Sequence, residues 1–105
     1  MTKASLGRED VIKHLKGAEK QIAALGVRRL AIFGSVLRNA ARPDSDVDLL
    51  VEFDPSRKTF DNFLALSELL ERLLDHPVDL LTIESLSPYI GPHILAEAED
   101  VVRAA

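Results

Sequence analysis

The chain has 105 residues, with 17 acidic against 13 basic side chains and a formal net charge of −4. This length predicts one domain, residues 1–105, and the acidic balance disfavours a protein that binds nucleic acid through a broad positive field. The absence of cysteine excludes disulfides and thiolate metal sites. The apolar runs are too short to span a membrane and the opening residues "MTKASLGRED" lack the apolar core of a signal peptide, so we expect a cytoplasmic protein.

Hydrophobic periodicity and turn residues predict helices and strands in alternation. In chain order they are helix 9–25, strand 28–34, helix 35–41, strand 46–53, helix 59–76, strand 78–83, helix 87–100 and a short edge strand at 101–103. Gly26 stands where a left-handed cap would end the first helix. Pro43 and Asp44 indicate a turn, Thr59 can cap the long helix, and Pro77 should end it.

The long helix and the strands define the expected core. The helix carries an apolar stripe that we expect to be buried: Phe60, Phe63, Leu64, Leu70, Leu73 and Leu74. The apolar centre of strand 46–53 indicates burial on both faces of a sheet. This order predicts an α/β fold, a small mixed sheet with helices packed on it. The connection over 54–76 is long enough for a crossover, so strands 46–53 and 78–83 should be parallel neighbours.

Three aspartates are expected to meet on one face of that sheet. Side chains two apart on a strand point to the same side, so Asp46 and Asp48 should share a face at the start of strand 46–53. The motif "VDLL" occurs at 47–50 and again at 78–81, and pairing in register would set Asp79 beside Asp48. Carboxylates this close repel one another unless a cation neutralises them, and oxygen-only ligands favour Mg²⁺ or Mn²⁺.

The pair Asp46 and Asp48 is also compatible with other roles. Standing alone, an Asp-x-Asp more often shapes a turn than binds a metal. A calcium-binding EF-hand is excluded because the required glycine and glutamate are replaced by Leu49 and Pro55. A nucleotide-sugar glycosyltransferase also uses Asp-x-Asp, but it normally needs a much longer chain.

Gly34, Ser35 and Arg38 form a second cluster, where a strand turns into a helix. Glycine allows a ligand close to the backbone, the start of the next helix offers free N–H groups, and Ser35 adds a hydroxyl. Arg38, one turn later, can reach the same phosphate. A lone Gly-Ser is usually only a turn, and the chain has no P-loop motif.

Together, the two clusters resemble the signature of the nucleotidyltransferase fold superfamily. The span "GSVLRNAARPDSDVDLLVEF", with Asp79 about thirty residues later, is similar to the minimal nucleotidyltransferases that pair with HEPN-domain toxins as antitoxins. The resemblance implies that Gly34 and Ser35 hold the triphosphate, that Asp46, Asp48 and Asp79 hold Mg²⁺ (two ions, with Mn²⁺ as a substitute), and that Arg38 contacts phosphate. Val36 and Asn39 depart from the family, which commonly has a basic residue and a glycine there.

The resemblance also implies a reaction and a partner. The chain would transfer AMP from ATP to a hydroxyl, expected to be a tyrosine of a HEPN toxin, and so act as an antitoxin. The alternative is a non-catalytic module that neutralises its partner by contact alone. His14 and His76 are interpreted as structural, and His93 and Tyr89 as surface residues rather than as part of an acceptor site.

Overall fold

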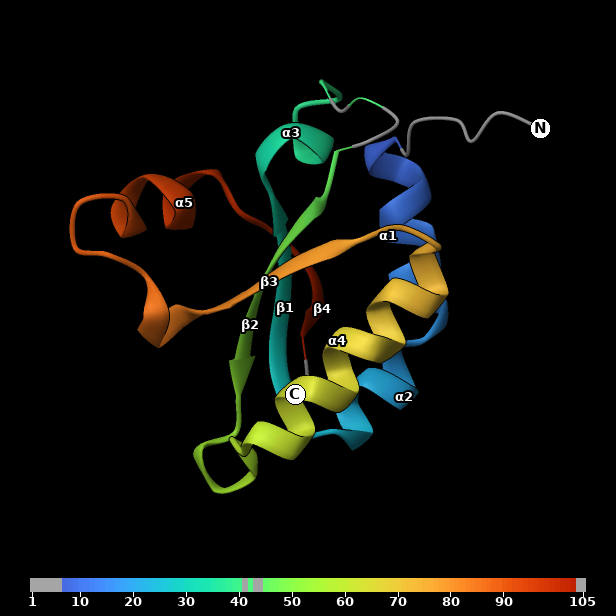
Figure 1. The fold of residues 1–105 in the computed structure, drawn as a ribbon, viewed down its shortest axis with the longest axis vertical. Coiled ribbons are helices and arrows are strands. Elements are labelled where there is room, and N and C mark those ends of the chain that lie inside the picture. The colour runs from blue at the N-terminus through green and yellow to red at the C-terminus, as the bar shows by residue number, and fades with distance from the viewer. Residues whose placement is uncertain (1–6, 41, 43–44, 104–105) are drawn as a thin grey trace.

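The computed structural model describes residues 7–40, 42 and 45–103. Figure 1 shows a sheet with most of the helices packed on one side and a helix close to the C-terminal end of the chain on the other. The elements in chain order are α1 (Arg8–Gly17), α2 (Glu19–Ala24), β1 (Val27–Phe33), α3 (Gly34–Leu37), β2 (Val47–Phe53), η1 (Pro55–Arg57), α4 (Phe60–Leu74), β3 (Val78–Thr82), η2 (Ile83–Ser85), α5 (Gly91–Glu97) and β4 (Glu99–Arg103). The α/β class and the small mixed sheet expected from the sequence are confirmed.

The sheet has the strand order β3-β2-β1-β4. β1 runs antiparallel to both β2 and β4, whereas β2 and β3 are parallel neighbours joined through α4. The two "VDLL" segments pair in register, with Val47 opposite Val78 and Asp48 opposite Asp79. The predicted crossover and the predicted pairing of the aspartates are therefore both confirmed.

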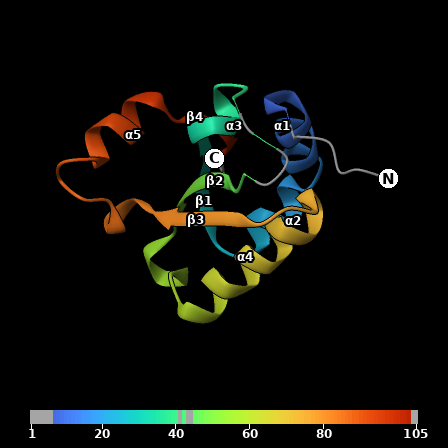
Figure 2. The same cartoon turned by 45° about the horizontal axis from the view of Figure 1, so that its top comes forward.

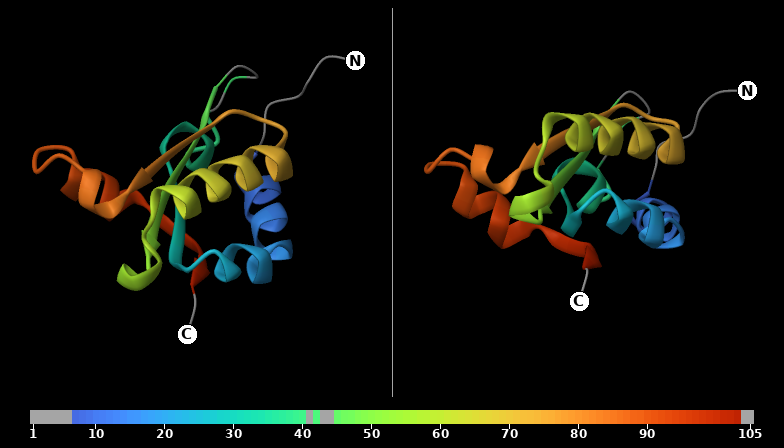
Figure 3. Two further views of the ribbon diagram at one scale, coloured as in Figure 1. Left: turned by 60° about the horizontal axis from the view of Figure 1, so that its bottom comes forward. Right: turned by 90° about the horizontal axis from the view of Figure 1, so that it is seen from below.

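The two faces of the sheet are covered unequally. On one face α1, α2 and α4 pack over Val47, Leu49 and Val51 and form the main core. On the other face Leu50, with Ala31 and Phe33 of β1, forms a smaller cluster that is packed against by Leu81, Ile83, Leu86, Ile94 and Ala98. Figure 3 shows this asymmetry from two further sides, with α5 apart from the other helices. β2 is thus buried on both faces, as its apolar centre predicts.

The prediction of a single helix over 9–25 is wrong, because the structure has two helices there, divided at Ala18. Ala18 leaves helical geometry, with φ −110° and ψ 18°, directly after Gly17. Glycine is a poor helix former, and the break turns the chain so that Leu15 before it and Ile22 after it are both fully buried. Gly26 follows α2 at φ 87°, the left-handed conformation expected of a cap.

The helix expected over 35–41 is only one turn long. α3 begins at Gly34 and ends at Leu37, and Asn39 then adopts φ 53°, a conformation that asparagine tolerates better than most residues. The expected turn at Pro43 and Asp44 lies outside the described residues.

The long helix is confirmed, but its apolar stripe was partly misplaced. Thr59 caps it, because its hydroxyl oxygen accepts the backbone N–H of Asn62 at 3.1 Å. The helix ends at Leu74 and not at Pro77, since Asp75 already turns the chain at φ 51°. The buried residues are Leu66, Leu70 and Leu74. Of the residues expected in the core, Phe60 is 75% exposed and Leu64 45% exposed, whereas Phe63 and Leu73 are partly buried against the core.

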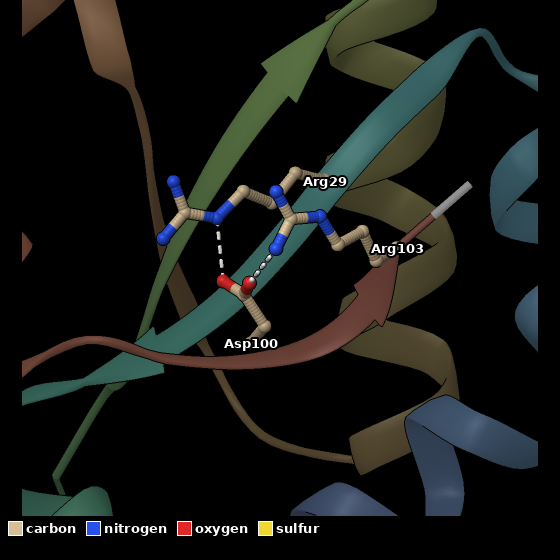
Figure 4. A network of polar contacts seen from close by, with 3 residues as sticks. All are labelled: Arg29, Asp100 and Arg103. Atoms are coloured by element: carbon tan, nitrogen blue, oxygen red, sulfur yellow. Dashed lines mark hydrogen bonds and ion pairs between the residues drawn. The ribbon is translucent and has the colours of Figure 1, made fainter. Parts of the chain in front are cut away.

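The last helix is also shorter than predicted, since α5 begins at Gly91 instead of residue 87. Proline is tolerated only in the first turn of a helix, so Pro92 must lie near the start of α5. Glu99 and Asp100, expected in that helix, belong to β4. Figure 4 shows why this strand is held in place: Asp100 accepts hydrogen bonds from Arg29 of β1 and from Arg103. No helix within the described ranges is long and apolar enough to cross a membrane.

Candidate functional site

The candidate site lies where β1 ends and β2 and β3 begin. β1 runs antiparallel to β2, so the last residue of β1, Phe33, pairs with Asp48 near the start of β2. β3 runs parallel to β2 and therefore begins at the same end of the sheet. Figure 2 turns this end forward, with α3 above it. The sheet thus brings the glycine-serine turn and the aspartates together, although the sequence separates them.

Asp48 is the most constrained of the three aspartates. It is half-buried and lies opposite Asp79, while Asp46 is exposed and precedes β2, which begins at Val47. Burial raises the pKa of the Asp48 carboxyl above its ordinary value of 3.8, the charges of Asp79 and Asp46 raise it further, and Arg38 opposes them. A carboxylate in this position is destabilised by its own surroundings, which is the condition that a bound cation relieves.

Gly34 forms the contact between the phosphate-binding turn and the acids. Its φ of 77° lies in the left-handed region that favours glycine. A Cβ atom added there would lie 2.1 Å from Oδ2 of Asp48. Any side chain would therefore collide with the carboxylate, so glycine is required both by the backbone conformation and by the close approach of Asp48.

Ser35 and Arg38 extend from this turn, and the structure shows a partner for Arg38 that the sequence analysis missed. Ser35 is half-buried in α3. Nη1 of Arg38 donates to both carboxylate oxygens of Glu97, at 2.8 and 3.0 Å. Glu97 Oε1 also accepts the backbone N–H of Gly34 at 2.7 Å. Glu97 is thus a fourth carboxylate of the site.

No local pattern in the sequence points to Glu97. It lies 63 residues from Gly34 and at the last position of α5. The signal that could have found it is the pairing of β4 with β1, in which Glu99 lies opposite Ile32. Continuing this antiparallel register by two residues brings position 97 opposite Gly34. The sequence analysis expected a helix up to residue 100 and so could not use this register.

The donor set suits a hard divalent cation, although it is not closed. Asp46, Asp48 and Asp79 offer only carboxylate oxygens, the ligands that Mg²⁺ prefers. Among the residues that the structure describes, no three His, Cys, Asp or Glu side chains already converge on one point as a metal site would require. The three aspartates therefore suit Mg²⁺ by the chemistry of their oxygens and by the raised pKa of Asp48. They lie where β2 and β3 begin.

The described hydrogen bonds of His14 and His76 go to backbone oxygens and not to the aspartates, and His93 and Tyr89 are surface residues. His14 contacts the backbone oxygen of Asp10 at 2.7 Å, and His76, at the end of α4, contacts that of Leu74 at 3.0 Å. His93 and Tyr89 are exposed, the latter by 87%.

Comparison with known proteins identifies the family. The model of the nucleotidyltransferase domain matches residues 12–101. The protein adenylyltransferase MntA of Thermococcus cleftensis is 38% identical over 95 residues, which cover 90% of this chain and 95% of that protein. A solved structure described as a candidate minimal nucleotidyltransferase shares 36% identity at a TM-score of 0.71, covering 84% of this chain and 93% of that one.

More distant structures share the fold. A complex of a tri-AMPylated Shewanella oneidensis HEPN toxin with an MNT antitoxin matches at a TM-score of 0.55 and 19% identity, covering 85% of this chain and 72% of that one. The solved structure at a TM-score of 0.71 agrees with the α/β fold described above. The chain belongs to the nucleotidyltransferase family, is similar within it to the minimal nucleotidyltransferases, and is an enzyme of the nucleotidyl-transferring class.

Proposed function

We propose that this nucleotidyltransferase transfers AMP from ATP to a hydroxyl group of a partner protein and thereby silences it. The observation that carries the proposal is the contact at Gly34, whose amide faces Glu97 and whose Cα faces Asp48. This contact sets a turn suited to phosphate directly against a pair of carboxylates, Asp48 and Asp79. Phosphate and acidic groups are brought together in this way when a cation is bound between them.

In the proposed reaction the acceptor oxygen attacks the α-phosphorus of ATP. A new oxygen–phosphorus bond forms, the bond between the α-phosphorus and the oxygen bridging to the β-phosphate breaks, and pyrophosphate leaves. The acceptor hydroxyl gives up its proton, which Asp79 or solvent takes. Gly34, Ser35 and Arg38 would orient the triphosphate, because a phosphoryl-transfer enzyme contributes mainly position and charge.

Asp46, Asp48 and Asp79 would hold the Mg²⁺ ions that the resemblance implies. When bound, such ions supply Lewis-acid stabilisation of the phosphate oxygens and of the attacking and leaving oxygens. The chain's own contribution is the alignment of β2 with β3, which holds Asp48 and Asp79 as direct neighbours before any ligand arrives.

The proposed acceptor is a tyrosine hydroxyl of a HEPN-domain toxin. Two findings support it: a relative covering nearly the whole chain is named a protein adenylyltransferase, and an MNT antitoxin of the same fold is known in complex with an AMPylated HEPN toxin.

The test is a transfer assay with the purified chain, Mg-ATP and a candidate HEPN-domain partner. Intact-mass spectrometry should show the partner gaining one or more AMP units, and peptide mapping should place them on tyrosine. Asp48→Asn should abolish the transfer, because it removes a carboxylate from the centre of the site. Glu68→Gln, an exposed charge change on α4, is the matched control and should transfer at the wild-type rate.

Full transfer by Asp48→Asn would contradict the assigned site. A partner that is neutralised equally well by wild type and by Asp48→Asn, without added AMP, would instead establish the alternative, a binding module that acts by contact.

A further inference from the structure

We propose that Glu97 is a positioning residue that holds Arg38 away from Asp48 and so keeps the metal-binding carboxylates free. This inference rests on the proposed function, which makes Asp48 a metal ligand. It adds a role for Glu97, which takes no part in the proposed transfer step. The evidence comes from the contacts around Gly34.

Two carboxylates approach Gly34, one at its N–H and the other at its Cα. Oδ2 of Asp48 lies 2.1 Å from the position of a Cβ built on Gly34, whereas Oε1 of Glu97 accepts the Gly34 N–H at 2.7 Å. Arg38 lies near both, because its guanidinium donates to Glu97, and Glu97 accepts the N–H of Gly34, the residue whose Cα Asp48 closely approaches. The Arg38 guanidinium could therefore form an ion pair with either Glu97 or Asp48.

Arg38 pairs with Glu97 because Glu97 is already positioned by the backbone. Its Oε1 accepts from both Gly34 and Arg38, and its Oε2 accepts from Arg38 as well. The pairing of β4 with β1, strengthened by Asp100 with Arg29 and Arg103 (Figure 4), fixes the end of α5 from which Glu97 projects. The choice of partner is thus built into the sheet.

The contacts argue against Glu97 as a further metal ligand. Both of its oxygens face N–H donors, one from the Gly34 backbone and the others from a guanidinium. A ligand oxygen would have to turn a lone pair toward the cation, and a positive guanidinium beside it would repel that cation. Without Glu97, Arg38 would have Asp48 as the remaining carboxylate near Gly34, and an Arg38–Asp48 ion pair would compete with the metal.

The experiment measures Mn²⁺ affinity by electron paramagnetic resonance, without nucleotide or partner, in two backgrounds. In the wild-type background Glu97→Gln should weaken Mn²⁺ binding about fivefold, the ratio expected when an exposed ion pair of ordinary strength competes with the ion. In the Arg38→Met background the same change should have a much smaller effect, because no guanidinium is left to move onto Asp48 and only the distant charge of Glu97 is lost. Glu99→Gln, which removes an acidic charge that pairs with Arg8 at 3.6 Å, is the control and should leave Mn²⁺ binding unchanged.

Each other outcome overturns the inference. An equal loss of affinity in both backgrounds would make Glu97 a direct ligand. Unchanged affinity in both would leave it a purely structural residue, and absence of Mn²⁺ binding in the wild type would remove the competition altogether. The proposed function fails separately: a chain that shows the predicted Mn²⁺ pattern but adds no AMP to its partner would refute the transfer and leave the role of Glu97 intact.

Discussion

The substitution Asp48→Asn should stabilise the metal-free protein while abolishing its activity. Asp48 and Asp79 are direct neighbours on parallel strands, and two carboxylates about 6 Å apart repel by about 1.4 kcal/mol at an effective dielectric constant of about 40. Arg38 offsets part of this repulsion and Asp46 adds to it. We therefore expect a gain of about 1 kcal/mol in the free energy of unfolding at pH 7 in the presence of EDTA.

The gain should depend on pH in a defined direction. The folded state raises the pKa of Asp48 above 3.8, so the folded protein holds its proton more tightly than the unfolded chain does. The penalty for ionising Asp48 is fully present above the raised folded-state pKa and disappears as the pH falls below the unfolded value. Asp48→Asn should thus be more stable than wild type at neutral pH, and the difference should vanish in acid.

Urea denaturation in EDTA is the measurement. With an m-value of about 1.5 kcal/mol per molar, the expected gain raises the urea midpoint by about 0.7 M. Mg²⁺ at ten times its Kd should stabilise the wild type by about 1.4 kcal/mol and the variant by less. The exposed Glu68→Gln on the opposite face of the sheet controls for net charge. A variant less stable than wild type at pH 7, or a gain that persists in acid, would refute the account of Asp48 as an electrostatically strained carboxylate.

Substitutions at Gly34 and at the cap and the two sides of α4 test the fold. Gly34→Ala should cost roughly 1–3 kcal/mol by urea denaturation, from the left-handed backbone and the collision with Asp48, and should abolish AMP transfer; a stable, active variant would contradict this. Thr59→Ala should cost about 1 kcal/mol through loss of the helix cap, and Thr59→Ser should restore most of it. Phe60→Ser should change stability by no more than about 0.5 kcal/mol, whereas Leu66→Ala should cost about 2–5 kcal/mol, and the reverse order would mean that the burial of α4 is wrong.

The pairing of β2 with β3 could be predicted because the two strands carry the same pattern. In both, apolar residues surround one aspartate, and a shift of one residue would move Leu49 or Leu80 from the core to the opposite face. Burial of the apolar residues therefore fixes the register of the two strands, and in this register Asp79 lies opposite Asp48. The position of Gly34 was predictable for a related reason, since few residues other than glycine can turn a strand so sharply into a helix.

Glu97 and the exposed part of α4 could not be predicted, for different physical reasons. The position of Glu97 depends on a pairing between β1 and β4 across most of the chain, and hydrophobic periodicity describes only local structure. Phe60 and Leu64 are apolar, but the sheet covers only one side of α4, the side of Leu66 and Leu70. Periodicity shows that a helix has an apolar side without showing how wide a neighbouring surface will cover it.

The balance of charge around Gly34 explains why two adjacent carboxylates should have different roles. Glu97 receives a backbone N–H and a guanidinium, so its charge is satisfied within the chain. Three negative charges act on Asp48, those of Asp79, Asp46 and Glu97, and the positive charge of Arg38 opposes them. Because Arg38 is engaged by Glu97, its help to Asp48 acts only at a distance. A positive charge from outside the chain therefore gains most beside Asp48 and Asp79, and this is where we place the ions that the proposed transfer requires.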